Sequence, residues 1–183
     1  MTAHQSQEVL ENGVDDVQQA PTDEGTLELI VVRPASGQRI VQDEGRLTFH
    51  DGLEGDNWRF RMIGNATDIE PETDNQISII NVRVVRLLDP DPERWPLAGD
   101  QLYVDFNLSE DNVPPGTRLQ IGETVVEVTD LPHTGCKAFA ERFGVTAMRF
   151  VNSEVGSQLH MRGVMTRVIT EGAIHKGDAV VKM

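Results

Sequence analysis

The segment from Arg118 to Thr129 (RLQIGETVVEVT) shows the pattern that decides the fold class. Polar and apolar residues alternate from Arg118 to Ile121 and again from Thr124 to Thr129, as in strands with one buried face. Gly122 and Glu123 separate the two runs, and a two-residue connection with glycine favours a tight hairpin. The segment therefore predicts two neighbouring antiparallel strands.

Similar short runs occur along the rest of the chain. They are rich in β-branched residues and are bounded by Gly, Pro, Asp or Asn. The further strands are expected at Thr26 to Arg33, Gln38 to Gln42, Arg46 to His50, Gln76 to Ile80, Leu102 to Phe106, Met165 to Thr170 and Ala179 to Lys182. Short helices are expected at Val82 to Leu88 (capped by Asn81), Lys137 to Phe143 and Val145 to Phe150. Many short strands with few helices predict a mainly β fold of the α+β class, a small mixed β-barrel.

The first residues differ from the rest in composition. Residues 1–24 contain no Lys or Arg but carry six acidic side chains. Such a segment has little apolar surface to bury, so it is predicted to be a disordered acidic tail. The folded domain is accordingly expected at residues 25–183. Between its predicted strands, residues 51–75 are polar and contain several glycines, which predicts a long loop.

The chain of 183 residues has a formal net charge of -14, from 30 acidic and 16 basic side chains. This balance argues against nucleic acid or an anionic membrane as a partner, because both require a concentrated positive surface. No apolar run approaches the roughly 20 residues of a membrane span. The only cysteine cannot form an intramolecular disulfide, so we expect a cytoplasmic protein with a free thiol.

That cysteine, Cys136, is the main candidate for chemistry. It follows the turn-forming sequence from Pro132 to Gly135 and is expected in the first turn of a helix, next to Lys137. Free N–H groups there favour a thiolate, which attacks electrophiles, carries sulfur or binds a soft metal. The alternative is a small buried apolar residue. His133 could act as a base, although a satisfied or solvent-facing histidine is the commoner case.

Basic side chains near this thiol would create a binding site for a small anion. The candidates are Arg59, Arg61, Lys137, Arg142, Arg149, Arg162 and Arg167. Their convergence on Cys136 is not visible in the sequence, and separate surface ion pairs are the default. Nucleotide-binding glycine loops, a serine-nucleophile motif and the spacing of a multi-cysteine zinc site are not found.

Four stretches in order resemble the MOSC domain, the molybdenum cofactor sulfurase C-terminal domain. They are GLEGD at 52–56 with QISII at 76–80, GDQL at 99–102 with PGTRLQIG at 115–122, the cysteine segment around 136, and residues 162–178 with the motifs RGV, RV, GAI and GD. The resemblance implies a mixed β-barrel and a single functional cysteine. It assigns Cys136 as the residue that carries sulfur or ligates molybdenum in a pterin cofactor.

The favoured hypothesis, a stand-alone MOSC-like protein, adds partners and further site residues. Lys137, Arg142, Arg162 and Arg167 would hold the anionic cofactor, and Gly55 and Asp56 would shape the loop that borders it. A sulfur-donor or electron-transfer protein would be the macromolecular partner, and no pyridoxal phosphate is expected on this chain alone. The reaction would be sulfur transfer or a molybdenum-dependent reduction.

Two alternatives remain open. Asp56 is followed by Asn57-Trp58-Arg59-Phe60 instead of the histidine-glycine-glycine loop of many relatives, Gln101 replaces a usual asparagine, and Gly135 stands where proline is common. These departures favour a binding module that has kept the barrel without the chemistry. The second alternative is a redox-active or nucleophilic cysteine protein without molybdenum, which requires a lowered thiol pKa.

Overall fold

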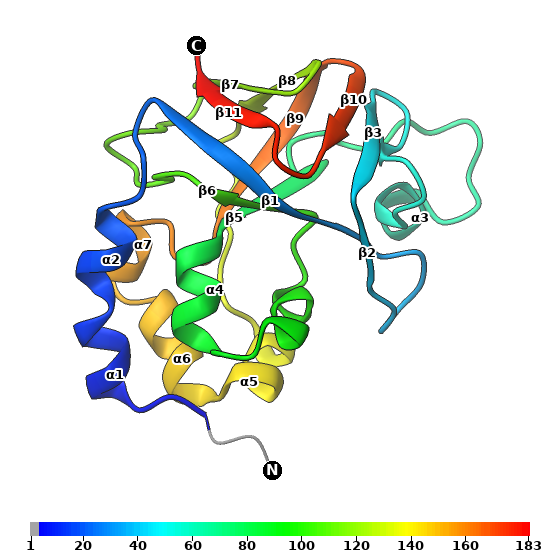
Figure 1. The fold of residues 1–183 in the computed structure, drawn as a ribbon. Helices are drawn as coiled ribbons and strands as arrows, with labels where there is room; N and C mark the ends of the chain where they lie inside the picture. Colours follow the sequence, from blue (N-terminus) through cyan, green and yellow to red (C-terminus); the bar gives the residue numbers. More distant parts are fainter. Residues whose placement is uncertain (1–3) are drawn as a thin grey trace.

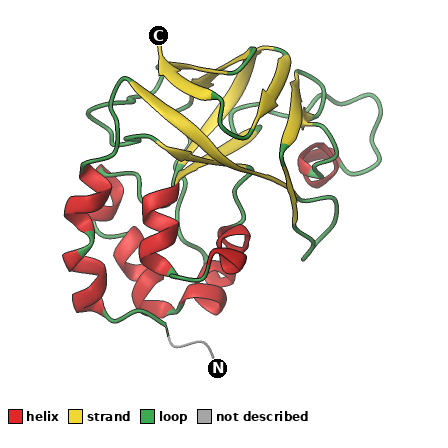
Figure 2. Cartoon of the chain, viewed as in Figure 1, coloured by secondary structure: helices red, strands yellow, loops and turns green. Residues whose placement is uncertain are grey.

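A β-barrel and a group of short helices beneath one end of it form the two layers of this computed structural model, which describes residues 4–183 (Figures 1 and 2). The strands are β1 (Glu24–Val32), β2 (Ile40–Gln42), β3 (Glu44–Thr48), β4 (Gly52–Leu53), β5 (Ile77–Asn81), β6 (Leu102–Asp105), β7 (Arg118–Ile121), β8 (Thr124–Val128), β9 (Val164–Thr170), β10 (Gly172–His175) and β11 (Ala179–Lys182). The helices are α1 (Gln7–Asn12), α2 (Val14–Gln18), α3 (Trp58–Ile63), α4 (Val82–Leu88), the 3-10 helix η1 (Pro92–Ala98), α5 (Lys137–Phe143), α6 (Val145–Val151) and α7 (Glu154–Gln158).

The barrel follows the strand order β11-β7-β8-β9-β5-β6-β1, and a pairing between β11 and β1 closes it. All of these pairs are antiparallel except β5 with β6, so the sheet is mixed. β2 adds to the outer edge of β1, and β10, β3 and β4 form a separate three-stranded sheet. The predicted fold class, a mainly β mixed barrel with short helices, is confirmed.

Local patterns explain several barrel elements. In β7 and β8, Leu119, Ile121, Val126 and Val128 point into the barrel core, and Ile121 pairs with Thr124 across the predicted turn. β5 is buried along its whole length, because one face meets the barrel core and the other meets the helices. Burial without alternation is typical of a strand covered on both faces, and here it includes the polar Ser78 and Asn81.

The β5–α4 junction begins the helical layer as the sequence predicted. The Asn81 side chain accepts a hydrogen bond from the Arg83 N–H at 2.9 Å and so caps α4. Val84, Val85 and Leu88 of α4 then pack with Tyr103 in a second core cluster beneath the barrel. The helices therefore share a core that is separate from the barrel interior.

The prediction of a disordered tail at residues 1–24 is wrong over the described part. Residues 7–18 form α1 and α2, and Leu10 and Val17 are buried in the helical core (Figure 1). Apolar residues at positions 10, 14 and 17 follow helical spacing, so a narrow apolar face is buried despite the acidic composition. Arg83 of α4 also donates to the Asp16 carbonyl at 3.0 Å. Residues 1–3 of the expected tail lie outside the described residues.

The long loop predicted at residues 51–75 contains β4 and α3. Trp58 at the start of α3 is fully buried, and its indole N–H donates to the Asn75 side chain at 3.0 Å. This contact fixes α3 on the side of the molecule away from the main helical group (Figure 2). Within residues 4–183, no helix combines the length and hydrophobicity that crossing a bilayer requires.

Candidate functional site

Cys136 lies immediately before α5, as the sequence predicted, with an extended backbone (φ -104°, ψ -178°) and an exposed side chain. The backbone N–H of Phe139, in the first turn of α5, is the largest influence on its thiol and lowers the pKa below the ordinary cysteine value. Burial opposes this effect, while the Ala138 N–H and the charge of Arg162 add to it. The side chain is therefore accessible and biased towards the reactive thiolate.

Asn152 fixes the turn that leads to Cys136. Its side-chain oxygen accepts from the Gly135 N–H at 2.7 Å, and its amide donates to the Gly135 carbonyl at 2.9 Å. A Cβ atom at Gly135 would meet Val151 at 3.0 Å, so glycine permits this close approach to the end of α6. The two hydrogen bonds satisfy the backbone groups of Gly135 and so fix the position of the residue that precedes Cys136.

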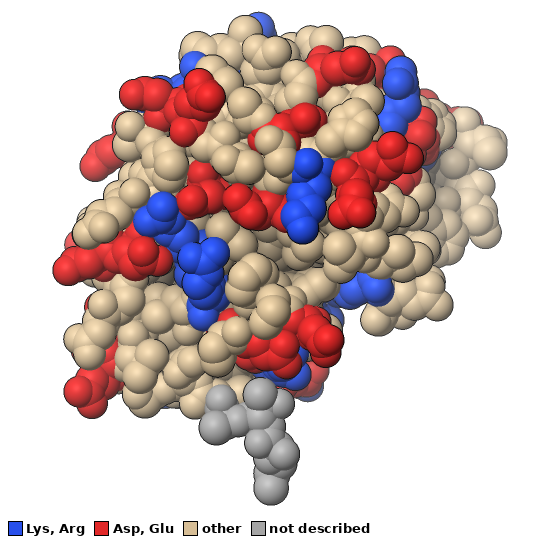
Figure 3. Space-filling model, in the orientation of Figure 1, with Lys and Arg blue, Asp and Glu red and all other residues tan. Residues whose placement is uncertain are grey.

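Cys136 opens into a cavity of about 270 Å³, here called the Cys136 cavity. Five arginines line it although the chain as a whole is acidic: Arg33, Arg39, Arg61, Arg142 and Arg162. They come from the end of β1, the approach to β2, α3, α5 and the segment before β9. By contrast, acidic side chains are spread over the face of the molecule that Figure 3 shows.

Arg33 is one of two arginines in this cavity that have a buried carboxylate partner. Asp56, whose side chain is 0% exposed, accepts from the Arg33 Nε at 2.8 Å and from its second guanidinium nitrogen at 2.9 Å. The same carboxylate accepts from the backbone N–H groups of Arg33 and Trp58, each at 2.9 Å. Asp56 thus joins β1 to α3 and holds Arg33 in a bidentate geometry.

Arg162 is the second. Its Nη1 donates to the fully buried Asp100 at 2.7 Å and its Nη2 donates to the Ala98 carbonyl at 3.0 Å. The guanidinium also lies over the Phe139 ring, 5.1 Å from its centroid. We call Arg33 and Arg162 the paired arginines.

Arg39, Arg61 and Arg142 form the other group, here called the open arginines. Among residues 4–183, none of the three has a carboxylate within ion-pair distance. Burial lowers the pKa of Arg39, and repulsion from Arg142 and Arg33 adds to the effect. Partial loss of water around the guanidinium and repulsion from Arg33 likewise lower the pKa of Arg61, which lies at the exposed rim of the cavity. The guanidinium groups remain charged but lack a counter-charge, which is what a bound anion supplies.

Two neutral side chains, Gln101 and Ser78, form one side of the cavity. The Gln101 side-chain oxygen accepts from the Ser78 N–H at 2.8 Å and from the Ser78 hydroxyl at 2.6 Å. Its amide donates to the Gln76 carbonyl at 3.0 Å. Gln101, one of the departures from the family pattern, is therefore held by β5 and gives the cavity a rigid, uncharged side.

His133 differs from the sequence expectation of a satisfied or solvent-facing histidine. Its side chain is 10% exposed, and its Nδ1 has no hydrogen-bond partner among the described residues. The nearest carboxylate oxygen, Oδ1 of Asp100, is 3.6 Å away and also unpartnered. Burial lowers the pKa of His133 to about 3, with Arg162 and Arg33 acting in the same direction against Asp100.

The structure brings only some of the predicted residues together. Arg142 and Arg162 line the Cys136 cavity, whereas Lys137 and Arg167 do not. The Lys137 side chain is 92% exposed, with its ammonium 3.9 Å from Glu141, because the first residue of α5 points outward. Arg167 instead binds Glu127 at 2.7 Å and Asp74 at 3.3 Å.

Gly55 and Asp56 border the site in a different way from direct cofactor contact. Neither lines the cavity, and the Asp56 carboxylate is occupied by Arg33 and Trp58. Gly55 adopts φ +82°, a left-handed conformation that favours glycine and lets the chain turn into Asp56. The GLEGD stretch therefore positions Arg33.

Sequence reasoning missed Arg33, Arg39 and Asp100. Arg33 ends an apolar strand and Arg39 stands in a polar turn, so neither has a local pattern that points to a ligand. One signal for Asp100 was present in the sequence. It follows a glycine, Gly99, which adopts a left-handed conformation, within the GDQL stretch at 99–102. An aspartate next to a structural glycine and before a buried strand requires a cationic partner.

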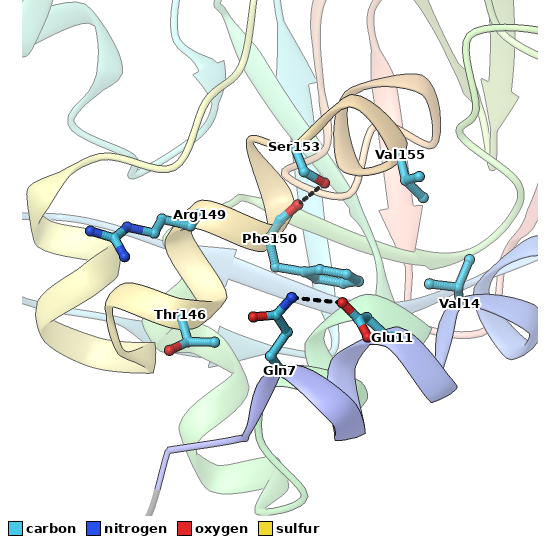
Figure 4. Close-up of a pocket in the computed structure, with 8 residues that line it drawn as sticks. All are labelled: Gln7, Glu11, Val14, Thr146, Arg149, Phe150, Ser153 and Val155. Carbon is cyan, nitrogen blue, oxygen red and sulfur yellow. Dashed lines mark hydrogen bonds between the residues drawn. The ribbon is translucent and has the colours of Figure 1, made fainter.

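The described residues contain no cluster of three or more His, Cys, Asp or Glu side chains that could hold a metal ion. A metal at Cys136 would thus bring most of its ligands with it, as one bound within an organic cofactor does. A separate hollow of about 500 Å³ lies between α1 and α6, lined by Gln7, Glu11 and Phe150 among others (Figure 4). Gln7 and Glu11 hydrogen bond to each other at 2.7 Å, and neither cysteine nor histidine lines this hollow.

Comparisons with known proteins agree with this architecture. The chain is similar to the solved structure of YuaD from Bacillus subtilis, with 17% identity, a TM-score of 0.59 and coverage of 86% of this chain and 94% of that one. It is also similar to YiiM from Escherichia coli (20% identity, TM-score 0.55, 86% and 69% coverage) and to YiiM from Geobacillus stearothermophilus (15%, 0.56, 87% and 75%). No curated protein sequence matches significantly.

A sequence model of the MOSC domain matches residues 73–181, which include Cys136 and two of the cavity arginines. The matched region starts after Arg33, Arg39 and Arg61, so the other three arginines come from the part of the barrel before it. The structural neighbours extend the same fold over that part as well. The chain belongs to the MOSC domain family.

Proposed function

We propose that this MOSC domain uses the Cys136 thiolate on an anionic group that the open arginines hold, and that this group is part of a molybdenum-pterin cofactor. The observation that carries the proposal is the placement of the only thiol of the chain beside three arginines that lack carboxylate partners. The family, whose name refers to a molybdenum cofactor sulfurase, supplies the identity of the cofactor. The reaction is sulfur transfer or a molybdenum-dependent reduction.

The donor set of the cavity fits such a group. A thiolate is a soft ligand and suits both sulfur and molybdenum. Guanidinium groups bind phosphate and oxyanions with charge-assisted hydrogen bonds. A volume of about 270 Å³ is small for a ligand pocket, so the cavity takes a group of phosphate or molybdate size, or that end of a larger cofactor. When bound, the cofactor supplies the redox chemistry, and the protein supplies the anion site and the thiolate.

In the sulfur-carrier form of the proposal, the Cys136 thiolate attacks the outer sulfur of a persulfide on a donor protein. The bond between the two donor sulfurs breaks, the donor leaves as a thiolate, and a persulfide forms on Cys136. No net oxidation or reduction takes place, because the sulfane sulfur moves with its oxidation state unchanged. In the reductive form, an electron-transfer protein is the partner. A reducing compartment such as the cytoplasm would keep the thiol available in either case.

The deciding experiment compares purified native protein with Cys136→Ser and with the double variant Arg39→Gln/Arg142→Gln. Molybdenum is measured by elemental analysis, pterin by extraction and fluorescence, and a persulfide by mass after treatment with a sulfane-sulfur donor. The proposal expects the cofactor or the added sulfur in the native protein, loss of both in Cys136→Ser, and loss of the cofactor in the double variant. Arg118→Gln, on the outside of the barrel, is the control that should keep both.

A protein with no molybdenum, no pterin and no persulfide after donor treatment would overturn the proposal. A cysteine enzyme without molybdenum is the second candidate, favoured by the lowered thiol pKa and the exposure of Cys136. It expects rapid oxidation or alkylation of Cys136 in protein that never contains cofactor. A binding module would be left if Cys136→Ser changed neither cofactor content nor anion affinity.

A further inference from the structure

A second cavity of about 300 Å³ adjoins the Cys136 cavity. The two share three wall residues, His133, Arg162 and Met165. The second cavity is formed by the segment from Val128 to His133, the end of α6, α7 and the segment that leads into β9. Only these shared residues would separate a molecule in the second cavity from the Cys136 cavity.

The two cavities differ in chemistry. Apolar side chains form one part of the second cavity, among them Val128, Leu131, Pro132, Val151, Val164 and Met165, and polar side chains such as Asn152 and Ser157 form the rest. Its remaining charged side chains include two exposed carboxylates, Glu110 and Asp130, and its arginine is the paired Arg162. This cavity lacks the open arginines of the Cys136 cavity, so it suits an uncharged molecule with an apolar body better than an anion.

Polar atoms without partners lie in the wall between the cavities and, for Asp100, buried behind it. Nδ1 of His133, Oδ1 of Asp100 and Nε of Arg162 are buried and have no hydrogen bond among the described residues. Nδ1 faces the Asp100 oxygen at 3.6 Å, and two lone pairs at this distance would repel each other. The imidazole proton therefore belongs on Nδ1, which leaves the lone pair on Nε2 as an acceptor.

No hydrogen bond to Nε2 of His133 occurs within residues 4–183. Nε2, unlike Nδ1, is not among the buried atoms without partners, so it can accept a hydrogen bond from a ligand donor in a cavity that His133 lines. Because burial keeps the pKa of His133 at about 3, the ring is neutral at physiological pH and does not attract an anion. The ligand group that suits it is an uncharged N–H or O–H.

We propose that the second cavity is a binding site for a small, uncharged organic molecule with an apolar or aromatic body, whose N–H or O–H donates to Nε2 of His133. In the context of the proposed function, this molecule is the organic substrate, and its polar end is directed at the group beside Cys136. The binding step itself does not depend on that function.

The cavity is also connected to the thiol by the backbone. Asn152 lines the second cavity and holds both polar groups of the Gly135 peptide, next to Cys136. Met165 lines both cavities from the start of β9. Occupation of the second cavity therefore contacts the residues that position the thiol as well as the wall between the sites.

The test uses three probes of one size: benzamide, which has an aromatic body and an N–H donor; methyl benzoate, which has no donor; and benzoate, which is an anion. Binding is measured in the Arg39→Gln/Arg142→Gln variant, whose Cys136 cavity has lost its anion site, and is followed by the carbon-13 methyl resonance of Met165, assigned with Met165→Leu. Benzamide is expected to bind, methyl benzoate to bind about fivefold more weakly for the lost hydrogen bond, and benzoate to bind least.

Two variants locate the interaction. His133→Phe keeps a ring but removes the acceptor, so benzamide should lose its advantage over methyl benzoate. Ser157→Trp places a large side chain on α7 at a position that lines the cavity and should abolish binding of all three probes. Ser36→Trp, on the exposed turn between β1 and β2, is the matched control and should change nothing. Equal binding of the three probes, preference for benzoate, or binding unaffected by Ser157→Trp would each overturn the proposal.

Cys136→Ser separates this inference from the proposed function. Benzamide binding that persists in Cys136→Ser, in protein without molybdenum or persulfide, supports the second cavity alone. Cofactor or persulfide at Cys136 without any benzamide binding would remove the second cavity and leave the proposed function intact.

Discussion

The paired arginines and the open arginines line one cavity, yet their charges are in opposite situations. Arg33 and Arg162 are almost fully buried, with side chains 8% and 9% exposed, and each binds a buried carboxylate. Arg39, Arg61 and Arg142 are more accessible and have no carboxylate partner within the described part of the chain. The first group therefore holds the fold around the thiol, and the proposed function assigns the second group to a ligand.

The largest expected effect comes from breaking a pair. Asp56→Asn keeps the shape of the side chain but leaves Arg33 as a buried cation without a counter-charge, which should reduce the free energy of unfolding by about 3–5 kcal/mol. Urea denaturation followed by fluorescence measures it. Asp105→Asn is the matched control, because Asp105 pairs with Arg83 where the side chains are 30% and 19% exposed, and it should cost about 1 kcal/mol or less. Equal losses in the two variants would contradict the structural role of the pair.

His133 gives the next largest effect, through pH. Its pKa is about 3 in the folded protein and near 6.5 when unfolded, so the unfolded state takes up more protons between these values. Stability should therefore fall as the pH drops below about 6.5, by up to about 1.4 kcal/mol per pH unit from this residue. Denaturation of the native protein and His133→Phe at a series of pH values measures the difference. Parallel curves would show that His133 is protonated or solvated in the fold.

The strands and the start of the site helix were predictable because their signals are local. The hairpin of β7 and β8, the Asn81 cap of α4 and the position of Cys136 before α5 all follow from a few neighbouring residues. The N-terminal helices were missed because the acidic composition of the segment obscured a short apolar periodicity that packs against α4 and α6.

The cavity itself was not predictable from local signals. Arg33 meets a carboxylate 23 residues away and Arg162 meets one 62 residues away. Such pairs depend on how the barrel closes. Lys137 and Arg167 were plausible by composition, but one points outward on α5 and the other is bound by Glu127 and Asp74. Which arginine faces a ligand is decided by the carboxylates near it, and these are distant in sequence.

A smaller effect is expected from the open arginines, and in affinity more than in stability. Arg142→Gln should leave the free energy of unfolding within about 1 kcal/mol of the native value, because it removes no ion pair and relieves repulsion on Arg39. The affinity for phosphate should fall about tenfold, as expected for one charge-assisted contact. Isothermal titration at low salt measures the affinity. Arg118→Gln, which breaks a surface pair with Glu127, is the control and should not affect phosphate binding. A large loss of stability with unchanged affinity would reverse the assignment of Arg142.

The smallest expected effect is on the thiol. The rate of Cys136 alkylation by iodoacetamide should rise with a midpoint below the ordinary pKa of a cysteine thiol, because N–H groups at the start of α5 and the charge of Arg162 favour the thiolate. Phosphate in the Cys136 cavity would place negative charge beside the sulfur, so saturating phosphate should move the midpoint upward by a few tenths of a unit to about one unit. Arg39→Gln/Arg142→Gln should remove this phosphate effect and leave alkylation itself intact, whereas a midpoint insensitive to phosphate in the native protein would mean that the open arginines bind their anion away from the sulfur.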